Sequence, residues 1–148
     1  MITALGYMIK KLETSIPGGI LLFFPSYDLM QHILGIWEEQ LIRFDREIFK
    51  EAKQANEFKA VFDRYIRKVQ RGKKAMLVCV CRGKLSEGID FADDAARAIF
   101  VIGVPYPCVN DPRVVQKQQY LDMKVKEEPN LELNGERWYK LQASRTVN

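Results

Sequence analysis

The sequence of 148 residues has few of the features of disulfide-stabilised, membrane-anchored or secreted proteins. It has three cysteines, an odd number, so they cannot all pair with one another in a disulfide scaffold. The longest apolar runs, residues 20–25 and 75–81, are far shorter than the ~20 residues that cross a bilayer, so no membrane partner is expected. Lys10, Lys11 and Glu13 stand where a secretory signal needs an apolar core. With no Asn-x-Ser/Thr site either, these absences favour an intracellular protein.

Several catalytic signatures are absent as well. The sequence has no Gly-Lys-Ser/Thr of a Walker loop, no Rossmann glycine fingerprint, no His-Glu-x-x-His and no Gly-x-Ser-x-Gly. His32 is the single histidine and lacks zinc-ligand spacing, so we expect no metal site. Cys79 and Cys81, two apart on one strand, are expected to be packed thiols. A nucleotide would therefore meet this chain as the second wall of a site completed elsewhere.

The composition is that of one globular domain with a hidden charge asymmetry. Hydrophobic residues make up 47% of the chain, charged residues 28%, and the net charge is +4. Residues 64–84 carry eight basic side chains and no acidic one, which leaves 15 basic against 19 acidic side chains elsewhere. Such a segment is typical of a polyanion-binding surface, although a solvated helix end followed by a basic turn explains it equally well.

Apolar strands alternate with amphipathic helices along the chain. Strands are predicted at residues 20–24, 75–81 and 98–104, each buried on both faces, with a weaker strand at 44–49. Helices are predicted at about residues 4–15, from the cap residue Ser26 through Leu41, at about 54–71, from Pro112 onwards, and from Glu136 to the end. The alternation indicates an α/β fold with a parallel sheet flanked by helices.

Ligand chemistry in such sheets lies at the carboxyl ends of the strands. Residues 25–28, 82–93 and 105–111 follow the predicted strands directly. The segment 82–93 is the richest in polar groups, and its two glycines allow the backbone to approach a ligand closely. Tyr27 and Tyr106 each follow a strand end, where a ring either stacks on a base or simply packs.

The segment 82–91, Arg-Gly-Lys-Leu-Ser-Glu-Gly-Ile-Asp-Phe, resembles motif V of the XPD-like DNA helicases, an iron–sulfur branch of superfamily two. Residues 18–27, Gly-Gly-Ile-Leu-Leu-Phe-Phe-Pro-Ser-Tyr, resemble motif IV of the same family. Residues 103–122 are similar to the segment after motif V, and 138–148 to the lead-in to motif VI. Phe-Phe-Pro-Ser-Tyr and Pro-Tyr-Pro are most similar to the Fanconi anaemia group J and telomere-elongation-regulator branches.

The resemblance covers nearly the whole chain in the family's order. It implies that residues 1–148 form most of the second RecA-like motor domain, a P-loop NTPase-type fold without a P-loop, truncated before the motif VI core. The parent would be an ATP-dependent helicase moving 5′ to 3′ on DNA in repair or genome maintenance. It would be nuclear and would use ATP and Mg²⁺, with a 4Fe–4S cluster in the missing N-terminal half. Expected partners are single-stranded DNA, that N-terminal motor domain, and repair or telomere proteins.

The resemblance also assigns roles to single residues. Glu87, Gly88 and Asp90 fall where family members couple the nucleotide to the DNA track, and Asp90 suits a ribose hydroxyl or an arginine across the cleft. We expect DNA contacts from a second set, whose hydroxyls, cations and aromatic ring suit phosphates and bases: Ser26, Tyr27, Lys73, Lys74, Arg82, Lys84 and Ser86.

The sequence leaves two other functions open. The fragment has no complete catalytic site, so it is expected to be inactive alone, and it would then act as a non-catalytic single-stranded nucleic-acid-binding or regulatory module. The blandest alternative is an unrelated parallel α/β domain with a solvated basic segment.

Overall fold

A computed structural model describes residues 1–52, 54–81, 91 and 93–147. The chain divides into two compact units, Met1–Gly103 and Val104–Asn148.

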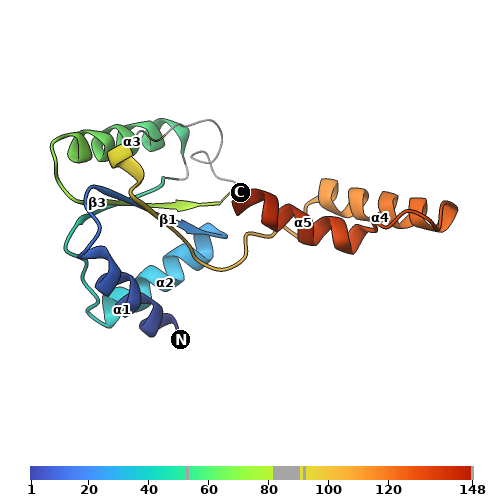
Figure 1. The fold of residues 1–148 in the computed structure, drawn as a ribbon, viewed down its shortest axis with the longest axis horizontal. Helices are drawn as coiled ribbons and strands as arrows, with labels where there is room; N and C mark the ends of the chain where they lie inside the picture. Colours follow the sequence, from blue (N-terminus) through green and yellow to red (C-terminus); the bar gives the residue numbers. More distant parts are fainter. Residues whose placement is uncertain (53, 82–90, 92, 148) are drawn as a thin grey trace. The chain divides into compact units, whose positions relative to one another are not determined.

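The first unit is built on a four-stranded parallel sheet (Figure 1). Its strands lie in the order β2-β3-β1-β4. They are β1 (Gly19–Phe24), β2 (Glu47–Lys50), β3 (Ala75–Val80) and β4 (Ala98–Val101). The predicted α/β class with a parallel, helix-flanked sheet is confirmed.

Helices cover both faces of this sheet. On one face, α1 (Ile2–Glu13) and α2 (Tyr27–Glu39) bury a core that includes Trp37. On the other face lie α3 (Ala55–Gln70) and the short 3₁₀ helix η2 (Asp93–Ala96), with Tyr65 in the centre of that core. All six residues of β3 are buried, which explains its continuous apolar sequence.

Two sequence-based expectations are wrong in detail. The apolar face of the second helix does not extend to Leu41, because α2 ends at Glu39, and Leu41 takes a positive φ of 55° with 71% of its surface exposed. The strand predicted at 98–104 stops at Val101, and its burial alternates. Ile99 and Val101 remain 58% and 37% exposed, whereas Ala98 and Phe100, which point to the other face of the sheet, pack against the core beneath α1 and α2.

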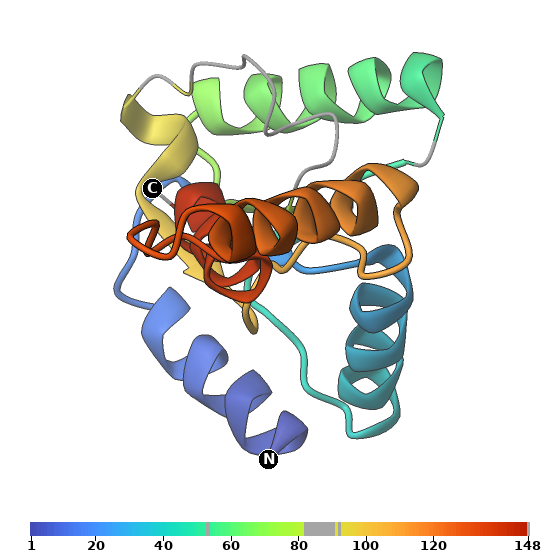
Figure 2. The ribbon, with the colours of Figure 1, turned by 90° about the vertical axis from the view of Figure 1, so that its right-hand side faces the viewer.

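The second unit is a pair of helices, α4 (Pro112–Glu127) and α5 (Gly135–Val147), that pack side by side (Figure 2). Asp111 caps α4 by accepting a hydrogen bond from the Arg113 N–H at 2.9 Å, as the Asp-Pro pair predicts. Gly135 lets the helices approach closely, since a Cβ there would lie 2.6 Å from the Gln118 carbonyl oxygen. In the parts of the chain that the structure describes, no helix combines the length and apolarity needed to span a membrane.

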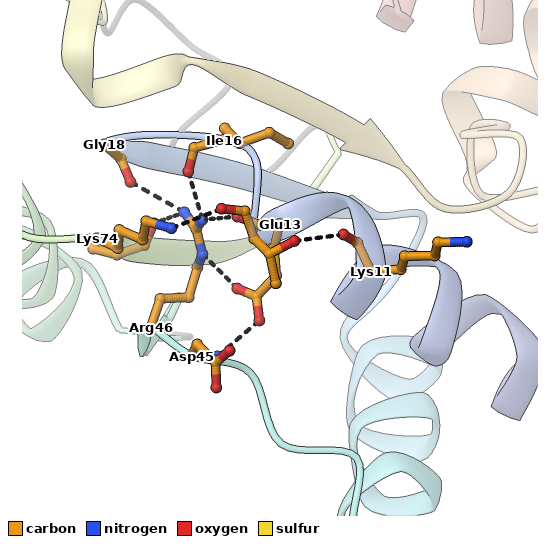
Figure 3. Close-up of polar contacts among 9 residues, drawn as sticks. Lys11, Glu13, Ile16, Gly18, Asp45, Arg46 and Lys74 are labelled. Carbon is orange, nitrogen blue, oxygen red and sulfur yellow. Dashed lines mark hydrogen bonds and ion pairs between the residues drawn. The ribbon is translucent and has the colours of Figure 1, made fainter.

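A buried ion pair joins the connections at the amino end of the sheet in the first unit (Figure 3). Arg46 Nε donates to Glu13 Oε2 at 2.6 Å, and both side chains are at most 1% exposed. The other Arg46 nitrogens donate to four main-chain carbonyls, those of Glu13, Ile16, Gly18 and Ala75, at 2.7–3.3 Å. The second carboxylate oxygen of Glu13 accepts from the Asp45 N–H at 2.7 Å. One guanidinium therefore ties together the end of α1, the turn before β1 and the start of β3.

Candidate functional site

The carboxyl edge of the sheet brings together segments that are far apart in the sequence. The Cys81 N–H donates to the Phe24 carbonyl at 2.7 Å, and the Ile102 N–H donates to the Phe23 carbonyl at 2.8 Å. The chain therefore leaves β1, β3 and β4 at neighbouring points. Gly103 fits against Pro25 there, with a positive φ of 78°. This is the edge at which an open parallel sheet places its ligands.

Ser26 stands at this edge as the N-cap of α2. Its Oγ accepts a hydrogen bond from the Leu29 N–H at 3.2 Å, so the predicted cap is confirmed. The side chain is exposed, and the first amides of the helix lie beside it. A helix start of this kind favours an anionic group through its amides and its dipole, although the exposed Asp28 in the first turn adds a negative charge nearby.

Tyr27 is the first residue of α2 and is half-buried against the core beneath the helix. Burial raises the pKa of its hydroxyl, with smaller contributions from the charge of Glu51 and from a hydrogen bond with that carboxylate. The ring is thus anchored at its hydroxyl end and packed along part of its surface. Tyr27 thus packs against the core, as one half of the sequence-based alternative expects, and its stacking on a base stays a prediction.

Glu51 is a residue of this edge that sequence reasoning did not identify. It follows β2, is 4% exposed, and accepts a hydrogen bond from the Val80 N–H at 2.7 Å. Its own N–H donates to the Val78 carbonyl at 2.8 Å. Glu51 therefore connects three elements: the end of β2, the end of β3 and the start of α2. The only signal for it in the sequence is an acidic residue two positions after the weakest predicted strand, 44–49.

The residues expected in motif V lie outside the described part of the chain. These are the coupling residues and the neighbouring DNA contacts: Arg82, Lys84, Ser86, Glu87, Gly88 and Asp90. Cys81 immediately precedes them, and its backbone is fixed to Phe24. Cys81, the last described residue before this segment, is therefore held at the end of β1, the strand that leads to Pro25 and Ser26.

Lys73 and Lys74 lie at the opposite edge of the sheet from Ser26 and Tyr27. They precede β3, whose six residues span about 20 Å at roughly 3.3 Å per residue. Lys74 Nζ donates to the Thr14 carbonyl at 2.9 Å, while Lys73 is exposed. The predicted DNA-contacting residues that the structure describes therefore separate into two groups.

The cysteines behave as packed or surface thiols. Cys79 and Cys81 are buried, and Cys108 is exposed. Burial raises the pKa of the Cys79 thiol well above its usual range, and the nearby Glu51 and Cys81 act in the same direction. Among the described residues, no group of three or more His, Cys, Asp and Glu side chains is arranged to hold a metal ion.

Comparison with known proteins connects this fold to a family. Residues 9–148 match the helicase C-terminal domain family. The chain is 36% identical to the regulator of telomere elongation helicase 1 homologues of Drosophila erecta and Drosophila melanogaster, over 99% of its own length and 15% of theirs.

The fold is also similar to solved structures. A structure of S. tokodaii Xpd4 superposes with a TM-score of 0.61 at 14% identity, and a structure titled XPD helicase with a TM-score of 0.60 at 19% identity. Each alignment covers 99% of this chain and about a quarter of the solved chain. The resemblance to XPD-like helicases is thereby confirmed, and the chain belongs to the helicase C-terminal domain family.

Proposed function

We propose that this chain is most of the second motor domain of an ATP-dependent DNA helicase that moves 5′ to 3′ on a single strand in repair or genome maintenance in the nucleus. It contributes DNA contacts and one wall of the ATP cleft, and it does not hydrolyse ATP alone. The chain spans about 15% of the length of the curated relatives it matches, so the activity belongs to a longer parent.

One observation carries the proposal. The hydrogen bond from the Cys81 N–H to the Phe24 carbonyl joins the end of β3 to the end of β1, and Cys81 is the last described residue before segment 82–90. This bond supports a link through which motif V would act on the turn that begins α2. A motor needs such a link, because nucleotide closure at one segment must change the grip on DNA at its neighbour.

The residues at the carboxyl edge of the sheet suit DNA contacts that do not depend on base sequence. The Ser26 hydroxyl and the first amides of α2 are donors for a phosphate, and the Tyr27 ring is a stacking surface that Glu51 orients. In segment 82–90 we assign Arg82, Lys84 and Ser86 to DNA phosphates. Glu87, Gly88 and Asp90 would couple the nucleotide to that grip.

ATP with Mg²⁺, and a 4Fe–4S cluster, would be held mainly by the rest of the parent. The sequence has three cysteines, one fewer than a four-thiolate cluster requires, and two of them are buried in the first unit. The sequence also lacks a Walker loop, so the phosphates of ATP would be held by another part of the parent. The N-terminal motor domain is then an obligatory partner, and repair or telomere proteins are candidate further partners.

The test uses the parent protein with single-stranded DNA. ATPase activity stimulated by DNA is expected, and Asp90→Ala should reduce it sharply without changing the melting temperature. Asp63→Ala, which removes an exposed carboxylate from α3, is the matched control and should leave turnover unchanged.

Two results would contradict the proposal: a fully active Asp90→Ala parent, or ATP turnover by the 148-residue chain alone. DNA binding by a parent that lacks ATPase activity would favour the non-catalytic binding module.

A further inference from the structure

A positively charged groove lies on the β2 side of the first unit, away from Ser26 and Tyr27. It has a volume of about 320 Å³ and lies between β2 and the second half of α3. We call it the basic groove, and its lining residues are Glu47, Phe49, Arg64, Arg67, Lys68 and Arg71. Four of these six side chains are cations and one is an anion.

Helical spacing produces this concentration of charge. Arg64, Arg67 and Lys68 occupy positions i, i+3 and i+4 of α3, and Arg71, the C-cap residue of the helix, follows at i+7, so the four share one face. They extend about 10 Å along the helix at 1.5 Å per residue, enough to reach more than one phosphate of a nucleic-acid backbone.

The cations of the groove are only partly neutralised. Glu47 pairs with Lys68 at 2.7 Å and lies 3.9 Å from Arg64. Within the described ranges of the chain, Arg67 and Arg71 have no carboxylate partner, and Arg67 Nε donates instead to the Asp63 carbonyl on its own helix. Two guanidinium groups are therefore available to an external anion.

The lining favours phosphates over an acidic protein segment. Phe49 is 5% exposed, and the Arg64 guanidinium lies 5.7 Å from its ring centroid. The described lining thus offers neither an apolar anchor for a peptide side chain nor a free ring for a base. Guanidinium groups match phosphate oxygens through paired hydrogen bonds, and a phosphate backbone needs no apolar anchor.

More cations lie beside the groove. Lys68 also lines an adjoining hollow with Lys73 and Lys74, at the amino edge of the sheet, although Asp45 and Glu47 line this hollow too. The cations at the amino edge are therefore partly balanced by carboxylates, and the groove itself carries the larger excess of positive charge.

We propose that the basic groove is a second nucleic-acid contact, which holds phosphates without reading bases and is separate from the carboxyl edge of the sheet. It goes beyond the proposed function, because a phosphate grip at this place requires neither ATP nor the other motor domain. Its role is to retain a nucleic-acid strand while the contacts at the carboxyl edge change.

The test measures binding of fluorescein-labelled (dT)20 to the 148-residue chain at several salt concentrations. In Arg67→Gln/Arg71→Gln the slope of log affinity against log salt should flatten by about 1.4, since each lost contact with a single strand removes about 0.7. Glu47→Gln should do the opposite, tightening binding and steepening the slope, because Lys68 and Arg64 are released.

The matched control is Lys10→Gln/Lys11→Gln, which removes two cations from α1 on the other face of the same unit. It should change the slope much less than the groove variant. All substituted groove cations are on the protein surface, and unchanged melting temperatures establish that the variants are folded.

Three results would overturn the proposal: an unchanged slope in the groove variant, an equal loss in the α1 control, or a groove variant that loses binding to a poly-glutamate peptide but not to (dT)20. Failure of the proposed motor function gives a different result, because the ATPase of the parent would then be absent while the groove variant still loses (dT)20 affinity.

Discussion

The buried pair of Arg46 and Glu13 gives the sharpest stability prediction. In Arg46→Met a flexible apolar side chain replaces the guanidinium, and all five of its hydrogen bonds are lost. The Glu13 carboxylate then stays buried, with the Asp45 N–H still donating to it. Removing one member of a buried pair costs about 3–5 kcal/mol, and the remaining donor places our expectation near the lower end, about 3 kcal/mol.

The assay is urea unfolding followed by Trp37 fluorescence. Trp37 is 2% exposed and belongs to the same unit as the pair, and a Trp138→Phe background removes the other tryptophan. With a slope of about 2 kcal/mol per molar urea, a loss of 3 kcal/mol lowers the midpoint by about 1.5 M. Arg46→Lys should be intermediate, because it keeps the charge but cannot reach all five acceptors.

Arg43→Met is the matched control, since Arg43 is exposed and lies on the same connection before β2. We expect it to change the unfolding free energy by less than about 0.5 kcal/mol. The reasoning is refuted if Arg46→Met costs no more than Arg43→Met, or if Glu13→Gln is neutral.

Three further predictions concern the same unit. Burial raises the pKa of Tyr65 above its ordinary value of 10.0, so the fold favours the neutral phenol; stability should be constant below pH 10 with respect to this group and fall above it, and Tyr65→Phe should show a smaller fall in urea titrations at pH 8 and 10.5. Gly35→Ala should stabilise α2 by about 0.5–1 kcal/mol because a Cβ there meets nothing within 4 Å, whereas Gly19→Ala should destabilise strongly because its Cβ would lie 2.2 Å from the Tyr65 hydroxyl; thermal melts of the two variants test this contrast. Glu51→Ala leaves the buried Val80 N–H without its acceptor and should cost about 1–3 kcal/mol in the same melts, and an unchanged melting temperature would show that the carboxylate is dispensable.

Local patterns were sufficient to predict the architecture. The apolar runs of β1 and β3, the cap at Ser26 and the Asp111-Pro112 start each depend on neighbours in the sequence, and all four were confirmed. Side chains within a few residues of one another in the sequence largely decide whether a central strand is buried on both faces. They also largely decide where a helix begins.

Long-range chemistry was not predictable from these patterns. Glu13 and Arg46 are 33 residues apart, and nothing near either one indicates a partner. Glu51 and Val80 are 29 apart, and the weak strand signal of β2 gave no reason to expect a buried carboxylate at its end. Such pairings depend on which strands become neighbours, a property of the whole sheet.

The basic segment illustrates the same limit. Residues 64–84 are continuous in sequence, yet β3 lies within them and runs the length of the sheet. It separates Lys73 and Lys74 from Cys81, the last described residue of the segment, by about 20 Å. Closeness in sequence is therefore no guide to closeness in space when a charge run contains a strand.

The Arg46 contacts also bear on how this part of the protein can evolve. Four of its five hydrogen bonds end on main-chain oxygens, which every amino acid carries. Substitutions at Ile16 and Ala75 that preserve packing therefore leave the acceptors of Arg46 unchanged. A loop insertion that displaced those carbonyls would be far less tolerated, so homologous sequences should vary here by substitution more readily than by length.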